Sequence, residues 1–349
     1  DGSNLTNLPA EITKSSSDPT VSTNPAGGVG TVYLNTTSGE MFCLTDATAG
    51  SNVWTNIGDG IGSVRTFISA SGGTITTDGN YKVHTFTSSG AFAVSQGGDF
   101  DYLVIAGGGS GAATTYGAGA GGAGGYRNSF NSETSGGGGA SETAITATIQ
   151  SYTVTIGAGG AAVSNGALAG NLGSNSVLGS ITSTGGGYGT GGNNVGVTGG
   201  SGGGGSGEYA KAGGAGTSNQ GFAGGAGGGR QPAASENYQG GGGGGSGAVG
   251  ADGHADGTNN DGYGGAGLAS SITGSAVTRA GGGGGSVYNT NNGMNAGGVG
   301  GSGGGGAGGI TNTAGVSGTV NTGSGGGGGT ANSSGAGGSG VVIIRYQFQ

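Results

Sequence analysis

The chain has few basic residues and only one cysteine. The 349 residues include eight Lys and Arg and 16 Asp and Glu, which gives a formal net charge of −8 and a sequence pI of about 4.4. Scattered cations of this number cannot neutralise a row of phosphates, so no nucleic-acid partner is expected. Cys43 has no second cysteine with which to form an intrachain disulfide.

Long apolar runs and helical patterns are also missing. No stretch approaches the roughly 18 apolar residues of a membrane-spanning helix, so no membrane insertion is expected. No window repeats its apolar residues with the 3.6-residue period of an amphipathic helix. The sequence therefore predicts almost no α-helix.

The chain is instead rich in glycine, which occupies 102 of 349 positions. So much glycine without a repeat is typical of disorder, but disordered chains tend to be highly charged, and only 7% of these residues are charged. The glycines gather in blocks at 117–125, 202–205, 221–229, 240–245, 281–285, 297–309 and 325–329. If this region is ordered, side-chain burial is not what orders it.

Strand patterns lie on either side of these blocks. The clearest are a hairpin at 74–86 around Asp78-Gly79 and a continuous apolar run at 100–105, which suggests a strand buried on both faces. Other strands are expected at 65–69, 91–94, 142–149, 152–156 and 176–182. Strand patterns then nearly vanish until 341–348, and this last strand must pair with strands from far earlier in the chain. The glycine region is therefore predicted to be an insertion into a β-sheet framework.

The first part of the chain is different in character. Residues 1–24 are expected to form an extended arm or connector, because Pro9 and Pro19 break any helix. Residues 25–62 predict a small β module with strands at 30–35, 40–45 and 52–57, anchored by Phe42 and Trp54. The third segment, 63–349, would be a β-sandwich with glycine-rich insertions at 107–140 and 185–340, closed by the strand 341–348.

Polyglycine II helices, which share the polyproline II geometry, offer a way to order the glycine blocks. Such a rod has three residues per turn and rises about 3.1 Å per residue, with its N–H and C=O groups pointing sideways. Rods without side chains can approach and hydrogen-bond to one another, and the flanking strands would hold their ends. Interruptions by Ala and Ser are then expected on outward faces of peripheral rods; the examples are Ala118, Ala123, Ala226, Ser246 and Ala307. The predicted fold class is all-β plus polyglycine II helices, in which a jelly-roll-like β-sandwich carries an inserted bundle of rods.

The chain resembles the glycine-rich domain of phage tail fibres and adhesins. The resemblance rests on 85–94, Asp101-Tyr-Leu-Val-Ile-Ala-Gly-Gly-Gly109, 152–160 and the closing Gly337-Gly-Ser-Gly-Val-Val-Ile-Ile-Arg-Tyr346. The glycine-rich domain of anaplastic lymphoma kinase is similar in layout but bears disulfides, which this chain cannot form. The resemblance implies packed polyglycine rods whose connecting loops bind a host receptor, and 1–9 with 31–57 are similar to tail-fibre connector modules.

No set of residues predicts catalysis. His84 and His254 are the only histidines and are far apart in sequence, and His84 is expected on a strand, at the surface or in a sheet. The Gly-x-Gly-x-x-Gly strings lack a βαβ context, so no dinucleotide site is expected. Asp252, Asp256 and Asp261, with Asn259, are a weak candidate for calcium, but no bidentate Glu accompanies them. A solvated turn-rich loop is the alternative, and no other cofactor is expected.

The inserts between glycine blocks mix Tyr with Asn, Gln and Ser. This composition is typical of binding surfaces, where rigid rings combine with adaptable polar groups. The candidate receptor-binding residues are Tyr126, Arg127, Tyr209, Phe222, Arg230, Tyr238, Tyr263, Tyr288 and Asn289. The alternative for any single tyrosine is that it caps a rod end against neighbouring loops.

Two functions remain open at this point. The first is a non-enzymatic extracellular adhesin or tail-fibre-type protein that binds a cell-surface protein or glycan, as a trimeric fibre. The second is a structural subunit of an extracellular filament or surface layer, with the N-terminal arm docked on a neighbouring copy. Both imply a homo-oligomer, and the sequence names neither the receptor nor the number of copies.

Overall fold

The fold is nearly all β, as the sequence predicts. The computed structural model describes residues 12–58, 67–229, 238–254, 261–288 and 296–348, and the chain divides into two compact units, Asp1–Thr66 and Phe67–Gln349. The helical turns among these residues are two short 3-10 turns, Phe130–Ser132 and Gly136–Gly138. No described helix is long and apolar enough to cross a membrane.

The N-terminal unit is a four-stranded sheet in the order β1-β2-β3-β4. Its strands are Thr13–Ser15, Val32–Asn35, Met41–Asp46 and Val53–Gly58. The Trp54 ring packs edge-on against Tyr33 at 5.4 Å, over the fully buried Leu44.

The expected arm at 1–24 needs a correction. β1 pairs in parallel with β2, and the Asn52 side chain donates to the carbonyl of Thr23. Residues 13–24 are therefore part of the module, because their backbone groups find partners in its sheet. Residues 1–11 lie outside the described residues.

The second unit is built on two sheets. One has six strands, in the order β11-β9-β21-β7-β6 with β12 also on β9, and the other has five, in the order β15-β14-β13-β8-β5. The first sheet contains Tyr126–Asn128, Gly98–Ile105, Val341–Gln347, Tyr81–Phe86, Thr74–Asp78 and Ile145–Ala147. The second contains Ile181–Ser183, Ser176–Leu178, Ser151–Thr155, Gly90–Gln96 and Ser69–Ser71.

Two details of these sheets differ from the sequence-based expectation. The segment 176–182 is a hairpin of two strands, β14 and β15, rather than one strand. The segment expected at 142–149 is regular only over Ile145–Ala147. His84 on β7 lies in a sheet, which is one of the two placements expected for it, and it is fully buried with both ring nitrogens bonded inside the protein.

Strands β9 and β21 lie at the centre of the unit, with both faces covered. Their pairing is antiparallel, with Val342 opposite Val104 and Ile343 opposite Leu103. Val104 and Val342 join a core cluster with Phe92 of the other sheet, which makes the framework a β-sandwich. Leu103 and Ile343 point the other way, into a second cluster that includes glycine-region residues. The closing strand thus connects the sandwich to the glycine region.

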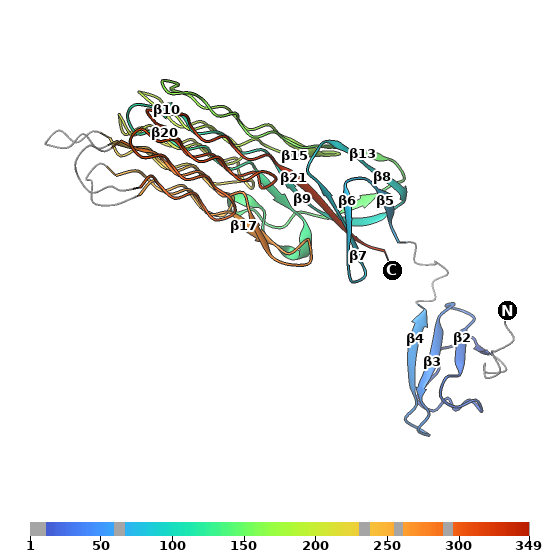
Figure 1. Cartoon of the computed structure of the whole chain (residues 1–349). Coiled ribbons are helices and arrows are strands. Elements are labelled where there is room, and N and C mark those ends of the chain that lie inside the picture. The colour runs from blue at the N-terminus through green and yellow to red at the C-terminus, as the bar shows by residue number, and fades with distance from the viewer. Residues whose placement is uncertain (1–11, 59–66, 230–237, 255–260, 289–295, 349) are drawn as a thin grey trace. The chain divides into compact units, whose positions relative to one another are not determined.

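Figure 1 shows the glycine segments running side by side from this framework to the end of the unit that carries β10 and β20. We call that end the distal end. Short strands that the sequence does not predict appear among these segments. They are Ala113–Thr114, Tyr238–Gln239, Leu268–Ser270, Val277–Arg279, Val287–Tyr288 and Gly329–Thr330, named β10 and β16 to β20.

Hydrogen bonds identify the glycine segments as polyglycine II rods. The N–H groups of the rod 118–125 donate in turn to three different segments: Gly119 to Thr190, Ala120 to Gly241, Gly121 to Gly326, Gly122 to Gly187, Ala123 to Gly244 and Gly124 to Gly323. Residues three positions apart donate to the same neighbouring segment, and their acceptors in that segment are also three positions apart. A β-strand bonds alternately to two sides, whereas a helix with three residues per turn bonds in three directions.

The rod 118–125 is the centre of the array. It donates to the segments 184–190, 241–244 and 323–326 and accepts from 106–112, 201–204 and 283–286. Neighbours on all sides leave no room for larger residues: a β-carbon built on Gly243 would lie 1.9 Å from the carbonyl oxygen of Gly121. Glycine is therefore required here for close approach of backbones.

The expected outward placement of Ala and Ser is wrong at three of the five positions. Ala118, Ala123 and Ser246 are fully buried, whereas Ala226 and Ala307 are half-buried. Ala123 packs in the second core cluster, where the rod meets apolar side chains of the sheet. The Ser246 hydroxyl accepts a hydrogen bond from the N–H of Leu268. Small side chains are thus tolerated where a rod borders the sheet or a turn.

Candidate functional site

The rods run out from the framework and back, so the inserts between them fall at opposite ends. The insert Thr115-Tyr116 follows β10 and lies at the distal end, whereas Tyr126-Arg127-Asn128 forms β11 and pairs with β9 in the sheet. The predicted site residues are therefore divided between two places.

Three tyrosines meet at the distal end, and we call them the distal tyrosine cluster. Antiparallel pairing of β16 with β19 sets Tyr238 opposite Tyr288. The Tyr116 ring lies 5.0 Å from the Tyr238 ring and 5.3 Å from the Tyr288 ring. Tyr238 is 5% exposed and Tyr116 is 36% exposed. The cluster thus has a buried base and an open rim, and aromatic contacts of this kind contribute about 0.5–1.5 kcal/mol each beyond area burial.

Two other predicted tyrosines are exposed, and one of them lies on a turn next to this cluster. The turn that carries Tyr209 is held by a bond from the N–H of Gly207 to the carbonyl of Gly117, next to Tyr116. Tyr209 is 56% exposed and Tyr263 is 42% exposed. Both rings are available to a partner at this end. Phe222 is half-buried on a rod, while Arg230 and Asn289 lie outside the described residues.

The carboxylate segment has polar partners of its own. Asp252 accepts a hydrogen bond from the N–H of Ala226 at 2.7 Å, and the Asp261 carboxylate is hydrogen-bonded to Nδ1 of His254. Asp256 and Asn259 lie outside the described residues. Within the described ranges, no group of three or more His, Cys, Asp or Glu side chains is placed to hold a metal ion.

Tyr126 and Arg127 lie at the base of the array instead. Tyr126 is fully buried in the second core cluster, so the expectation that it contacts a receptor is wrong. Burial raises the pKa of its phenol well above the usual range. The sequence predicts Tyr126 as a receptor contact because it follows a glycine block. Its rod ends at the sheet, however, and its ring packs in the core there.

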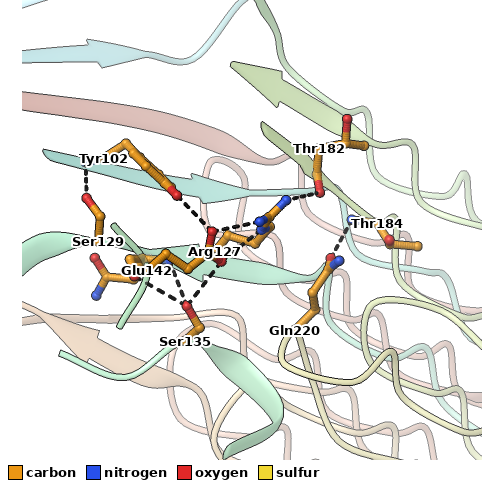
Figure 2. A network of polar contacts seen from close by, with 9 residues as sticks. Tyr102, Arg127, Ser129, Ser135, Glu142, Thr182, Thr184 and Gln220 are labelled. Atoms are coloured by element: carbon orange, nitrogen blue, oxygen red, sulfur yellow. Dashed lines mark hydrogen bonds and ion pairs between the residues drawn. The ribbon is translucent and has the colours of Figure 1, made fainter. Parts of the chain in front are cut away.

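Arg127 is the centre of a polar network that Figure 2 shows. Its guanidinium donates twice to the Glu142 carboxylate, at 2.8 and 2.7 Å, and once to the carbonyl of Thr182 at 3.1 Å. Glu142 also accepts a bond from the Tyr102 hydroxyl at 2.7 Å. Its carboxylate raises the pKa of Arg127, while burial and that carboxylate together raise the pKa of Tyr102.

An open cleft of about 550 Å³ lies beside this pair. We call it the basal cleft. Its lining residues are Arg127, Ala140, Ser141, Glu142, Thr143, Ser218, Asn219 and Gln220. The Gln220 side chain accepts from the N–H of Thr184 at 2.8 Å, which fixes the wall formed by the turn 218–220. Apart from Arg127, the sequence did not single out these residues, because they come from separate segments with no common pattern.

Comparison with known protein families gives a match. A family model described as a glycine-rich domain matches residues 85–347. These bounds begin in β7 and end with the last residue of β21, so the matched region includes the strands that hold the array as well as the rods. A search of curated proteins finds no match to the chain.

Proposed function

The chain belongs to the glycine-rich domain family, and from this premise we propose that it is a non-enzymatic extracellular adhesin of the tail-fibre type. In this proposal the β-sandwich and the N-terminal module attach the protein to its particle or to other copies. The packed rods form a stiff spacer, and the distal end contacts a cell-surface receptor.

The distal tyrosine cluster carries this proposal. Tyr116, Tyr238 and Tyr288 come from three separate segments, and their ring centroids lie 5.0 to 6.1 Å apart. Exposed Tyr209 and Tyr263 add amphipathic rings at the same end. Rings held by a rigid scaffold lose little conformational entropy on binding, and tyrosine is enriched at recognition surfaces for this reason.

The stiffness of the array supports the same proposal. Each interior rod is hydrogen-bonded in several directions, so the turns at its end are held in place before any partner binds. Preorganisation of this kind lowers the cost of binding.

The filament alternative has less support than the sequence suggests. It depended on an N-terminal arm that docks on the next copy. Residues 13–24 are engaged within their own module, since β1 pairs with β2 and Asn52 binds Thr23. The arm that remains is residues 1–11, which lie outside the described residues.

Labelled protein applied to a panel of bacterial surfaces tests the proposal. We expect saturable binding to some surfaces, blocked by an excess of unlabelled protein. Electron microscopy of the same preparation is expected to show discrete particles or short fibres. Micrometre-long polymers of the purified chain, together with no saturable binding to any surface, would overturn the adhesin proposal.

A further inference from the structure

The basal cleft is a candidate site separate from the distal end. It is open, its volume of about 550 Å³ lies within the roughly 300–1,000 Å³ typical of small-ligand sites, and its walls come from β11, the segment 140–143 and the turn 218–220. Nothing in the proposed adhesin function uses it.

Charge in the cleft is balanced. Arg127 and Glu142 are the charged residues in its lining, and they pair through two hydrogen bonds. The pair retains partial exposure, with side-chain accessibilities of 26% and 20%. The opposite charges of a bidentate pair cancel, so the cleft offers no net attraction to an anion or a cation. The oxygens and N–H groups at the exposed edge of the pair can still form hydrogen bonds.

Every other polar group in the lining is neutral and able to hydrogen-bond. Ser141, Thr143 and Ser218 carry hydroxyls, and Asn219 and Gln220 carry amides, each of which both donates and accepts. The Ser141 hydroxyl oxygen is shielded from solvent and has no hydrogen-bond partner in the described part of the chain. Thr143 and Asn219 are exposed. A ligand that matches this lining must also both donate and accept at many points.

The walls of the cleft are held in place. The turn with Asn219 packs closely on the glycine segment 136–139: a β-carbon built on Gly139 would lie 2.8 Å from the Asn219 β-carbon, and one built on Gly136 would lie 2.0 Å from the carbonyl oxygen of Gln220. The N–H of Tyr126 donates to the same carbonyl at 2.9 Å. The polar groups are therefore preorganised, which reduces the cost of binding a flexible ligand.

We propose that the basal cleft binds a neutral saccharide. Uncharged polyols present many hydroxyls that each donate and accept, which fits a charge-balanced lining of hydroxyls, amides and one bidentate ion pair. In this arrangement the Arg127–Glu142 pair bonds adjacent sugar hydroxyls from its exposed edge, and Thr143 and Asn219 bond the ligand from the rim. This site is independent of the distal tyrosine cluster and of the receptor bound there.

An array of neutral, anionic and cationic oligosaccharides, probed with the full chain, tests the proposal. Titration calorimetry of the best-bound oligosaccharide then compares three variants with the parent protein. Thr143→Trp fills the cleft from an exposed position, Asn219→Gly removes a lining amide while keeping the left-handed backbone (φ of 58°), and Ser151→Trp places the same ring on an exposed site of β13 as a control.

We expect a neutral oligosaccharide to bind, Thr143→Trp to weaken it at least tenfold, Asn219→Gly to weaken it several-fold, and Ser151→Trp to leave it unchanged. Three results would overturn the proposal: no neutral oligosaccharide binds, the preferred ligands are charged, or Thr143→Trp with an unchanged melting temperature binds as tightly as the parent. Cell binding measured on Thr143→Trp keeps the outcome separate from the adhesin proposal, because that function depends on the distal end.

Discussion

His84 and Tyr346 are 262 positions apart, and their side chains form a buried hydrogen bond of 2.9 Å between Nε2 and the phenol hydroxyl. The other ring nitrogen, Nδ1, lies 2.7 Å from the carbonyl of Gly72, so Nδ1 donates and Nε2 accepts from the tyrosine. The Phe92 ring is 5.1 Å away. This bond fastens the closing strand β21 to β7 inside the core, and with this assignment of donors the imidazole is neutral.

Stability should therefore fall as the solution is made mildly acidic. Burial lowers the pKa of His84 below its usual value; the bond to Gly72 opposes this shift and the positive charge of Lys82 adds to it. Below about pH 6.5 the histidine of the unfolded chain takes up a proton, whereas folded His84 resists protonation. The free energy of unfolding that depends on neutral His84 is therefore fully present above that pH. It decreases below that pH by up to about 1.4 kcal/mol per pH unit.

Urea unfolding between pH 7.5 and 5.5 measures this effect. His84→Gln should be less stable than the parent at pH 7.5 and should show a smaller loss on acidification. His254→Gln is the control, because His254 is exposed. An equal pH dependence in His84→Gln and the parent would rule out His84 as the titrating group.

Gly243→Val should destabilise the array severely. The added β-carbon would lie 1.9 Å from the Gly121 carbonyl oxygen, which belongs to the backbone of the central rod and cannot move alone. Overpacking a rigid site costs about 1–3 kcal/mol or more, so we expect a large fall in melting temperature or no folded protein. Gly90→Ala is the control, because a β-carbon there meets nothing within 4 Å. Equal melting of the two variants would contradict the packed-rod structure.

The sequence predicts the rods but not their arrangement. Apolar patterns identify strands such as 100–105, and the glycine blocks predict helices with three residues per turn. Which rods touch depends on turn lengths and on backbone bonds such as Gly121 to Gly326, and glycine has no side chain to encode that choice. Ala123 was misplaced for this reason: its rod borders the apolar face of β9 and β21, which is known only once the topology is known.

The site residues divide in a similar way. The position of Tyr209 and Tyr288 between glycine blocks predicts them as candidate contacts, and Tyr116 has the same kind of position although it is not among the predicted residues. The prediction that Tyr126 contacts a receptor is wrong because successive inserts lie alternately at the distal end and at the sheet. Glu142 carries no sequence signal, since its partner Arg127 is 15 residues away and the two meet only after β11 pairs with β9.

The Arg127–Glu142 pair should contribute to stability as a unit. The pair is bidentate and only partly exposed, so a coupling energy of about 1–2 kcal/mol is expected in a double-mutant cycle with Arg127→Met and Glu142→Gln. Urea unfolding of the parent, both single variants and the double variant gives this energy. Each single variant should lose more than half of what the double variant loses, because each leaves a partner behind. Purely additive losses would show that the pair is not coupled.

Loss of the distal rings should weaken surface binding without unfolding the protein. Tyr116→Ser and Tyr209→Ser remove exposed rings whose side chains lie outside both core clusters. Tyrosine is enriched among the few residues whose truncation costs about 2 kcal/mol or more at a recognition surface, so the double variant is expected to bind a recognised bacterial surface at least tenfold more weakly. Tyr81→Ser is the matched control, because Tyr81 is 39% exposed, close to the 36% of Tyr116, but lies on β7 in the sandwich. Binding is measured by competition with labelled parent protein, and melting temperatures confirm that each variant is folded. If Tyr81→Ser reduced binding as much as the distal double variant, the receptor-contacting surface would be the sandwich and not the end of the rods.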